Sequence, residues 1–226
     1  MPSRRDIFIN ENIYHVFDKT LDHKNVFLDR KLAALFLDLI TYYRSQKADL
    51  RYSHFKRLPE AERKNKEKQV KVKKYFKVEI LGYCLMYNHF HLLLQQNFKD
   101  GIIRFMSDVL NSLTRFYNIL NERNGPLFLP QFRSRHIISN DQLKHVSRYK
   151  HLNPYSGGIV KSLEALENYE FSSFKEYLNP KVGNISNSEV VLKLFGGNRE
   201  RYKKFVFANA EHQRTLEFVK YSMKWL

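Results

Sequence analysis

The sequence is poor in three things: cysteine, long apolar runs and acidic residues. Its single cysteine, Cys84, has no partner in the chain, so an internal disulfide is excluded and a reducing cytosol is the expected setting. No stretch approaches the roughly 20 apolar residues that cross a bilayer. The segment MPSRRDIFINEN also lacks the apolar core of a signal peptide. We therefore expect a soluble cytoplasmic protein.

The shortage of acidic residues gives the chain a strong positive charge. Its 23 Asp and Glu face 39 Lys and Arg, for a formal net charge of +16 among 226 residues. Such an excess favours a polyanionic partner, and nucleic acid is a stronger candidate than an anionic membrane. The composition, 43% hydrophobic and 15% aromatic, is that of a globular protein with a substantial core. The length fits one domain with an extension, or two small domains.

The charge is concentrated in one segment. From Arg44 to Lys77 the chain carries 13 Lys or Arg and four Asp or Glu, a net charge of +9. Such a run is either a solvated connector or a phosphate-binding surface. The stretch KVKKYFK (71–77) mixes aromatic residues with cations and leads straight into the next predicted strand. We therefore expect phosphate-binding charge close to whatever that strand and its hairpin partner carry.

Hydrophobic periodicity predicts alternating strands and helices. Strands are expected at 13–18, 76–86, 89–96 and 134–139, with Tyr87 and Asn88 forming a tight turn. Helices are expected at 29–43, 101–121 and 140–152, with Asp100 and Asn140 as N-caps and Pro154 as the stop. In the second helix, the apolar residues on one side are Ile102, Met106, Val109, Leu113, Phe116 and Leu120.

This order of elements predicts an α+β fold. It fits a ferredoxin-like antiparallel four-stranded sheet with helices on one face. After Gly157 and Gly158, residues 163–180 and 188–226 are predicted to form further helices docked on the sheet. These later helices would be a C-terminal extension.

The run MYNHFHLLL (86–94) places His89 and His91 one residue apart in a predicted strand. Side chains at i and i+2 of a strand point to the same face, about 7 Å apart along the chain. Two imidazoles at that spacing can converge on one metal ion if other elements complete the ligand set. Spacing alone favours the alternative, two core or rim imidazoles that carry no chemistry.

The run VSRYKHLNP (146–154) is the second unusual stretch. Tyr149 and Asn153 are four residues apart and so are neighbours on one face of a helix. A phenol is a poor nucleophile at neutral pH, but a metal that binds the electrophile compensates for this. Tyr149 is otherwise one of 14 tyrosines and fits a core position, and Asn153 before Pro154 is common where helices end.

Several segments together resemble a known family. The runs GYCLMYNHFHLLLQ, PLFLPQFRSR, RYKHLNPYSGGIV and YEFSSFKEYL resemble, in that order, segments of the single-tyrosine HUH transposases, particularly the REP-associated tyrosine transposases. HUH denotes His, a bulky hydrophobic residue and His, here residues 89–91. The family's usual Met-Pro-Asn-His lead-in is Met-Tyr-Asn-His in this chain (86–89), so the proline is missing. The resemblance covers roughly residues 10–180.

The resemblance implies roles for particular residues. His89 and His91 would be metal ligands, Tyr149 the nucleophile, and Asn153 would occupy the position of the third ligand. His151 is a rival third ligand, and Tyr155 is a rival nucleophile. The cations expected to contact DNA phosphates are Arg133, Arg135, Arg148, Lys150, Lys71, Lys73 and Lys74.

The implied activity is metal-dependent cleavage and rejoining of single-stranded DNA, as in transposition. The tyrosine would form a 5′-phosphotyrosine intermediate and release a 3′-hydroxyl. The cofactor would be a divalent cation, Mg²⁺ or Mn²⁺; a His/His/amide set suits Mn²⁺ better, and cellular abundance favours Mg²⁺. The expected partner is DNA whose palindromic repeats fold as hairpins, in a prokaryotic, nucleoid-associated setting.

The expected organisation is a transposase domain at 1–160, with the basic insertion at about 44–77, and a helical extension at 161–226 packed on it. Related enzymes include both monomers and homodimers, and the long tail favours a monomer. One alternative is a non-catalytic DNA- or RNA-binding protein on the same scaffold. A histidine-dependent nucleotidyl hydrolase with an H-x-H-x-H pattern is a poor fit, because Leu93 takes the place of the third His.

Overall fold

The computed structural model describes residues 7–183 and 185–222. Within them a four-stranded antiparallel sheet is formed by β1 (Ile13–Lys19), β2 (Val78–Leu85), β3 (His89–Gln96) and β4 (Arg133–Ile137). The strand order is β2-β3-β1-β4. This is the antiparallel ferredoxin-like sheet that the sequence predicts. The β2–β3 hairpin turns at Tyr87 and Asn88, where Met86 N donates to the carbonyl of His89 over 2.8 Å.

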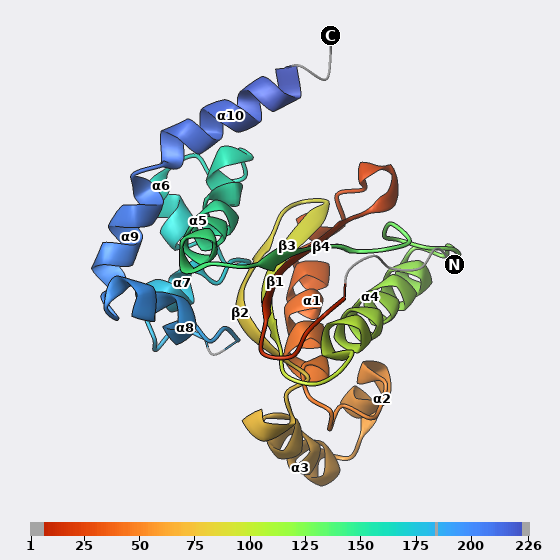
Figure 1. Ribbon diagram of the computed structural model, residues 1–226. Coiled ribbons are helices and arrows are strands. Elements are labelled where there is room, and N and C mark those ends of the chain that lie inside the picture. The colour runs from red at the N-terminus through yellow and green to blue at the C-terminus, as the bar shows by residue number, and fades with distance from the viewer. Residues whose placement is uncertain (1–6, 184, 223–226) are drawn as a thin grey trace.

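Two helices, α1 (Arg30–Tyr43) and α4 (Gly101–Leu120), pack together on one face of the sheet (Figure 1). The residues they bury meet strand residues such as Val16, Phe90 and Leu92 in the larger hydrophobic core. The buried side of α4 matches the prediction as far as Leu113. Phe116 and Leu120 are exposed, because the last turns of α4 extend beyond the core.

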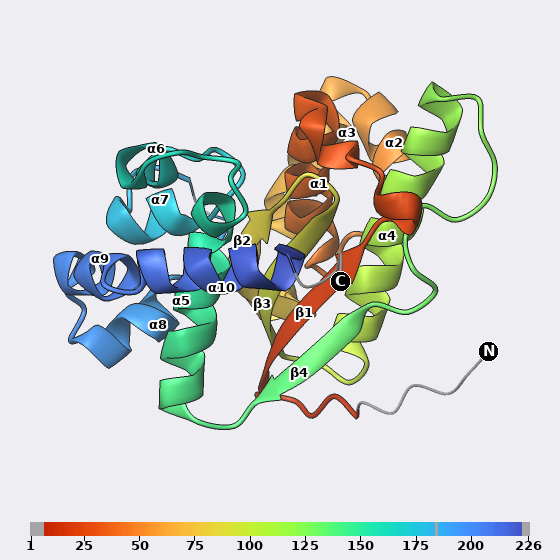
Figure 2. The same cartoon turned by 90° about the horizontal axis from the view of Figure 1, so that it is seen from above.

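The opposite face is covered by α5 (Asn140–Ser156) and the C-terminal helices (Figure 2). The expected placement of helices on one face therefore holds for α1 and α4, and α5 lies across the sheet from them. A second hydrophobic core joins Leu81, Leu93 and Ile137 of the sheet to Leu152 and other residues of α5 and the extension. Only part of this face is apolar, and its polar part carries the histidines.

Helix ends follow local chemistry, with three departures from the predictions. Asp29 caps α1 by accepting from Lys31 N, and Ser139, not Asn140, caps α5 by accepting from Gln142 N. Asp100 is left-handed, with a φ of 60°, and makes no side-chain cap. α5 also passes through Pro154 and ends at Ser156. Proline has no amide hydrogen, so it cannot donate the helical hydrogen bond to the carbonyl of residue 150.

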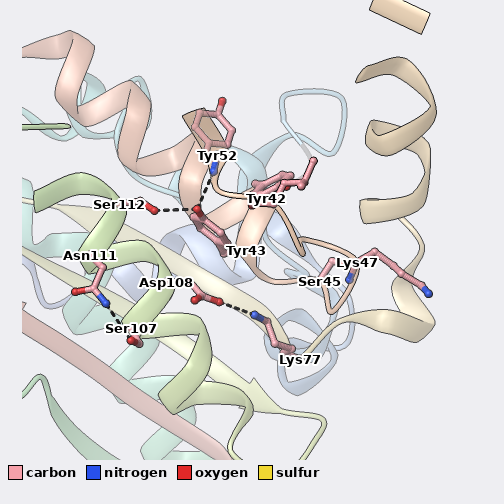
Figure 3. A network of polar contacts seen from close by, with 11 residues as sticks. Tyr42, Tyr43, Ser45, Lys47, Tyr52, Lys77, Ser107, Asp108, Asn111 and Ser112 are labelled. Carbon is pink, nitrogen blue, oxygen red and sulfur yellow. Dashed lines mark hydrogen bonds and ion pairs between the residues drawn. The ribbon is translucent and has the colours of Figure 1, made fainter. Parts of the chain in front are cut away.

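The basic insertion forms α2 (Tyr52–Arg57) and α3 (Glu60–Val70), beyond the end of the sheet where β2 begins (Figure 1). Polar contacts anchor this end to α1 and α4 (Figure 3). Tyr43 Oη and Ser112 Oγ share a hydrogen bond of 2.8 Å, and Tyr52 N donates to Tyr43 Oη over 2.9 Å. Lys77 Nζ pairs with Asp108 over 2.9 Å. Lys77 lies immediately before β2, so the anchored insertion meets the sheet at that strand's start.

The extension contains α6 (Leu163–Glu167), α7 (Phe174–Leu178), α8 (Glu189–Leu192), α9 (Arg199–Phe207) and α10 (Ala210–Ser222). Short 3₁₀ turns lie at Leu21–His23, Val26–Leu28, Lys73–Tyr75 and Lys193–Phe195. Before α7, Ser173 N donates to the carbonyl of Tyr83, and Leu85 N donates to that of Phe171. These bonds cover the outer edge of β2, which would otherwise expose unpaired backbone groups. The helices predicted within 188–226 are α8, α9 and α10, and residues 223–226 lie outside the described residues.

Candidate active site on the histidine face of the sheet

The strand register brings three histidines to one face. β1 and β3 pair so that Phe17 lies opposite His91 and Lys19 lies opposite His89. Because side chains alternate, His15 shares this face with Phe17, and the predicted pair His89 and His91 faces the same way. His15 was not among the predicted site residues. The alternation of IYHVFD predicts that His15 lies on a strand. It does not predict which strand lies beside it, and that strand is β3.

His91 contacts both of the other imidazoles. His15 Nε2 and His91 Nδ1 are hydrogen-bonded at 3.0 Å, and their rings stack with centroids 5.1 Å apart. The rings of His89 and His91 meet edge to face, with centroids 5.2 Å apart. His89 Nδ1 is in turn hydrogen-bonded to Asn88 Oδ1 at 2.7 Å. Both predicted metal ligands therefore have their Nδ1 atoms engaged by neighbours.

Tyr149 lies against this cluster. Its ring meets the ring of His91 edge to face, with centroids 5.8 Å apart and an interplanar angle of 89°. Its centroid is 6.5 Å from that of His15. Tyr149 is half-buried. The structure thus brings the predicted nucleophile, on α5, beside the predicted ligand pair, on β3.

Burial lowers the pKa of two of these imidazoles, those of His15 and His91. Desolvation, followed by the nearby charges of Lys150 and Arg135, lowers the pKa of His15 from 6.5 to about 4. Desolvation is also the largest cause that lowers the pKa of His91 well below its usual value, followed by the other two histidines and Lys150. A neutral imidazole keeps a free lone pair, which is the form that binds metal ions.

Lys150, predicted to contact DNA, is fully buried under the site. Its Nζ donates to Ser173 Oγ over 3.2 Å, and burial lowers the pKa of its amine to about 7. A residue without surface exposure cannot contact a phosphate backbone, so the prediction for Lys150 is wrong. Lys150 follows Tyr149 on α5, and its side chain points toward the sheet, where it fills the space next to Gly82.

Asn153 is buried near the start of α10, where Gln213 meets it. Gln213 Nε2 donates to Asn153 Oδ1 over 3.1 Å and to the carbonyl of Tyr149 over 3.1 Å. Asn153 Nδ2 is buried without a hydrogen-bond partner in the part of the chain that the structure describes. A carbonyl oxygen has two lone pairs, so Asn153 Oδ1 retains one for a further ligand.

The two rivals from the same helix are engaged elsewhere. Both ring nitrogens of His151 are occupied, Nδ1 by Tyr202 Oη at 2.7 Å and Nε2 by Ser173 Oγ at 2.9 Å. Tyr155 is buried, and its hydroxyl donates to Glu211 over 2.5 Å. Both side chains therefore belong to the packing of α5 against the extension.

The other predicted DNA-contacting cations lie in three places. Arg133 and Arg135 are exposed on β4. In the β1–β4 register Arg135 lies opposite His15, so the two arginines share the histidine face. Arg148 is half-buried, with its guanidinium 4.5 Å from the ring centroid of Phe205. The exposed lysines of the basic insertion, Lys71, Lys73 and Lys74, precede β2.

The insertion is far from the histidines, contrary to the expected proximity. β2 begins at Val78, and its residue opposite His91 is Cys84. At about 3.3 Å per residue, Val78 and Cys84 are roughly 20 Å apart along the strand. A strand that links two features in sequence also holds them at its two ends in space.

The donor set fits a divalent metal in part. Within residues 7–183 and 185–222, no group of three or more His, Cys, Asp or Glu side chains is arranged to hold a metal ion. His89 and His91 provide two imidazoles, and any further protein ligand must come from another kind of group, such as the amide oxygen of Asn153. Imidazole nitrogens with an amide oxygen form a set that suits Mn²⁺.

No family model matches the chain, and no curated protein matches it. Among solved structures, it is similar to a REP-associated tyrosine transposase bound to a REP hairpin. The TM-score is 0.55 and the identity 15%, over 82% of this chain and 90% of that chain. The chain has the fold of that transposase. At this identity the likeness establishes the fold, and it agrees with the family resemblance that the motifs carry. None of the helices in the described ranges has the length and apolar character needed to cross a membrane.

Proposed function

We propose that the protein is a metal-dependent single-stranded DNA endonuclease and strand transferase that uses Tyr149 as its nucleophile. The observation that carries this proposal is the edge-to-face contact between Tyr149 and His91, with centroids 5.8 Å apart. Residues far apart in the sequence, on β3 and α5, meet on a sheet face that is open enough to leave Tyr149 and His89 half-buried. A tyrosine in ordinary core packing needs no imidazole pair beside it.

His89 and His91 would hold the metal, with Asn153 as third ligand. A bound divalent cation neutralises charge on the scissile phosphate and orients it. The oxygen of Tyr149 attacks phosphorus, the bond from phosphorus to the 3′ oxygen breaks, and that oxygen takes a proton in place of the one lost by the phenol. The products are a 5′-phosphotyrosine and a free 3′-hydroxyl. The reverse reaction with another 3′-hydroxyl rejoins DNA without an energy source, since the ester bond is retained.

The substrate class is DNA that folds as a hairpin beside a single-stranded segment. The solved structure with the same fold has a REP hairpin bound, and the net charge of +16 favours a polyanion. Arg133 and Arg135 provide exposed cations on the histidine face, where single-stranded phosphates would approach Tyr149. The proposed role is in DNA transposition or recombination.

The test is covalent trapping. A hairpin oligonucleotide labelled on the 3′ side of the cleavage position, incubated with protein and Mn²⁺, is expected to give a protein–DNA band that survives denaturation. Tyr149→Phe should remove this band and leave hairpin binding intact, because only the phenolic oxygen is lost. The matched control is Tyr155→Phe, which should retain the band. Hairpin binding without any band in the unaltered protein would instead identify a non-catalytic DNA-binding protein.

A further inference from the structure

His15 stands outside every motif that points to the reaction, yet it is joined to one of the proposed metal ligands. His15 Nε2 lies 3.0 Å from His91 Nδ1, and both side chains are buried, at 7% and 6% exposure. Their rings stack with an interplanar angle of 21°. The pairing follows from the sheet, because β1 lies directly beside β3. The inference drawn from this contact rests on the proposed function.

The hydrogen bond constrains which nitrogen of His91 carries its proton. A neutral imidazole has one N–H donor and one lone pair. His91 Nδ1 faces His15, so the nitrogen left to bind a metal is Nε2, which must then be unprotonated. Metal binding through Nε2 thus requires the proton of His91 to sit on Nδ1, where it faces His15 Nε2. Metal-binding histidines commonly donate their second N–H to a partner that fixes ring orientation and tautomer.

We propose that His15 is a positioning residue, which accepts a hydrogen bond from His91 Nδ1 and so holds His91 Nε2 as the metal-binding atom. The usual partner in this role is a carboxylate or a backbone carbonyl. A carboxylate would add negative charge, whereas an imidazole provides a neutral acceptor beside the phosphate-binding site.

Packing alone does not explain a histidine at this position. Its partner on β3, Leu93, is a fully buried apolar residue, and an aliphatic side chain would fill the place of His15 without burying polar atoms. Burying an imidazole costs free energy unless its nitrogens are hydrogen-bonded. The partner that His15 has is a proposed ligand, which gives the buried polar atom a function.

The first measurement needs no variant. ¹⁵N NMR of the histidine-labelled full chain without metal reports directly which nitrogen of each imidazole is protonated. We expect His91 to be protonated at Nδ1 and His15 to be unprotonated at Nε2. His91 protonated at Nε2 would overturn the proposal, whatever the protein's activity.

The second measurement is Mn²⁺ affinity, followed by electron paramagnetic resonance of the free ion. His15→Leu should weaken Mn²⁺ binding about 10- to 100-fold and make the His91 tautomer heterogeneous. His15→Gln should restore much of the affinity, since its amide oxygen can replace Nε2 as acceptor. The control is His136→Gln, an exposed histidine on β4 whose ring stacks on Tyr14 of the opposite face.

The outcomes separate this inference from the proposed function. If Mn²⁺ binds and depends on His91 but is unaffected by His15→Leu, the positioning role is wrong and the proposed function stands. If the unaltered protein fails to bind Mn²⁺, the proposed function loses its cofactor, and the NMR measurement still decides the His15–His91 pairing. Should His15→Leu fail to fold, the tautomers of the unaltered protein and the affinity of His15→Gln provide the test.

Discussion

Lys150 occupies the space that a side chain on Gly82 would fill. A Cβ atom built on Gly82 would lie 1.8 Å from Lys150 Nζ and 3.0 Å from Ser173 Oγ. The amine of Lys150 therefore rests directly on the backbone of β2, and the next residue back along α5 is Tyr149. Because Gly82 has no side chain, Lys150 can pack against the sheet there. This packing helps to position α5, which carries the proposed nucleophile.

Gly82→Ala is expected to destabilise the protein by about 1–3 kcal/mol, because a methyl group would have to displace a buried amine. It should also reduce adduct formation more than the loss of folded protein explains, since α5 would shift relative to His91. Chemical denaturation and the covalent-band assay measure the two effects.

The control for this prediction is a double-mutant cycle. Lys150→Ala removes the clashing atoms, so Gly82→Ala should cost much less free energy in that background. Additive effects of the two substitutions would show that the Gly82–Lys150 contact does not position the helix.

Lys150 also predicts a pH dependence of stability. Burial lowers the pKa of its amine to about 7 in the folded state, from 10.5 in the unfolded chain. Between these values the unfolded chain binds more protons, so stability rises with pH across this window. From pH 7 to pH 9, the free energy of unfolding of the unaltered protein should increase by about 2 kcal/mol relative to Lys150→Met.

Urea denaturation at both pH values, compared between the two proteins, measures this difference. A constant difference would show that the amine titrates alike in the folded and unfolded states. The comparison with Lys150→Met cancels the titration of other groups, such as the Cys84 thiol, whose pKa burial raises to about 12.

Local patterns were enough to predict the four strands along the chain, and the Tyr87-Asn88 turn was enough to predict the hairpin of β2 and β3. They were also enough to predict that His89 and His91 share a face, since that depends only on strand geometry. The contact of Tyr149 with His91 required the family resemblance, because no local pattern determines where α5 docks.

Other features depend on neighbours that sequence patterns do not identify. His15 lies at the site because β1 pairs with β3, and local sequence patterns do not predict that pairing. Lys150 appeared to be a surface cation, and its burial depends on the gap over Gly82, a residue of another element. The basic insertion seemed close to the histidines because it is adjacent in sequence, but β2 lies between them.

The two groups of exposed cations should contact different parts of the DNA substrate. Arg133 and Arg135 share the histidine face, and Lys71, Lys73 and Lys74 lie beyond the far end of β2, roughly 20 Å away. A single strand of about four nucleotides bound at Tyr149 should depend only on the arginines. A hairpin carrying the same single strand should also lose affinity, with a shallower salt dependence, when the three lysines become Gln.

Fluorescence anisotropy at several salt concentrations, with both ligands and both multiple variants, checks this expectation. Equal losses for the short strand and the hairpin in the lysine variant would place those lysines near the scissile phosphate. No loss for either ligand would make the insertion a solvated connector.

The most direct measurement is the site of covalent attachment. The trapped protein–DNA adduct is digested with nuclease and with a protease that cleaves after acidic residues. The expected peptide, residues 142–164, contains both Tyr149 and Tyr155, and fragmentation in a mass spectrometer distinguishes them. We expect the nucleotide on the phenolic oxygen of Tyr149. A nucleotide on Tyr155 or any other residue would contradict the proposed chemistry.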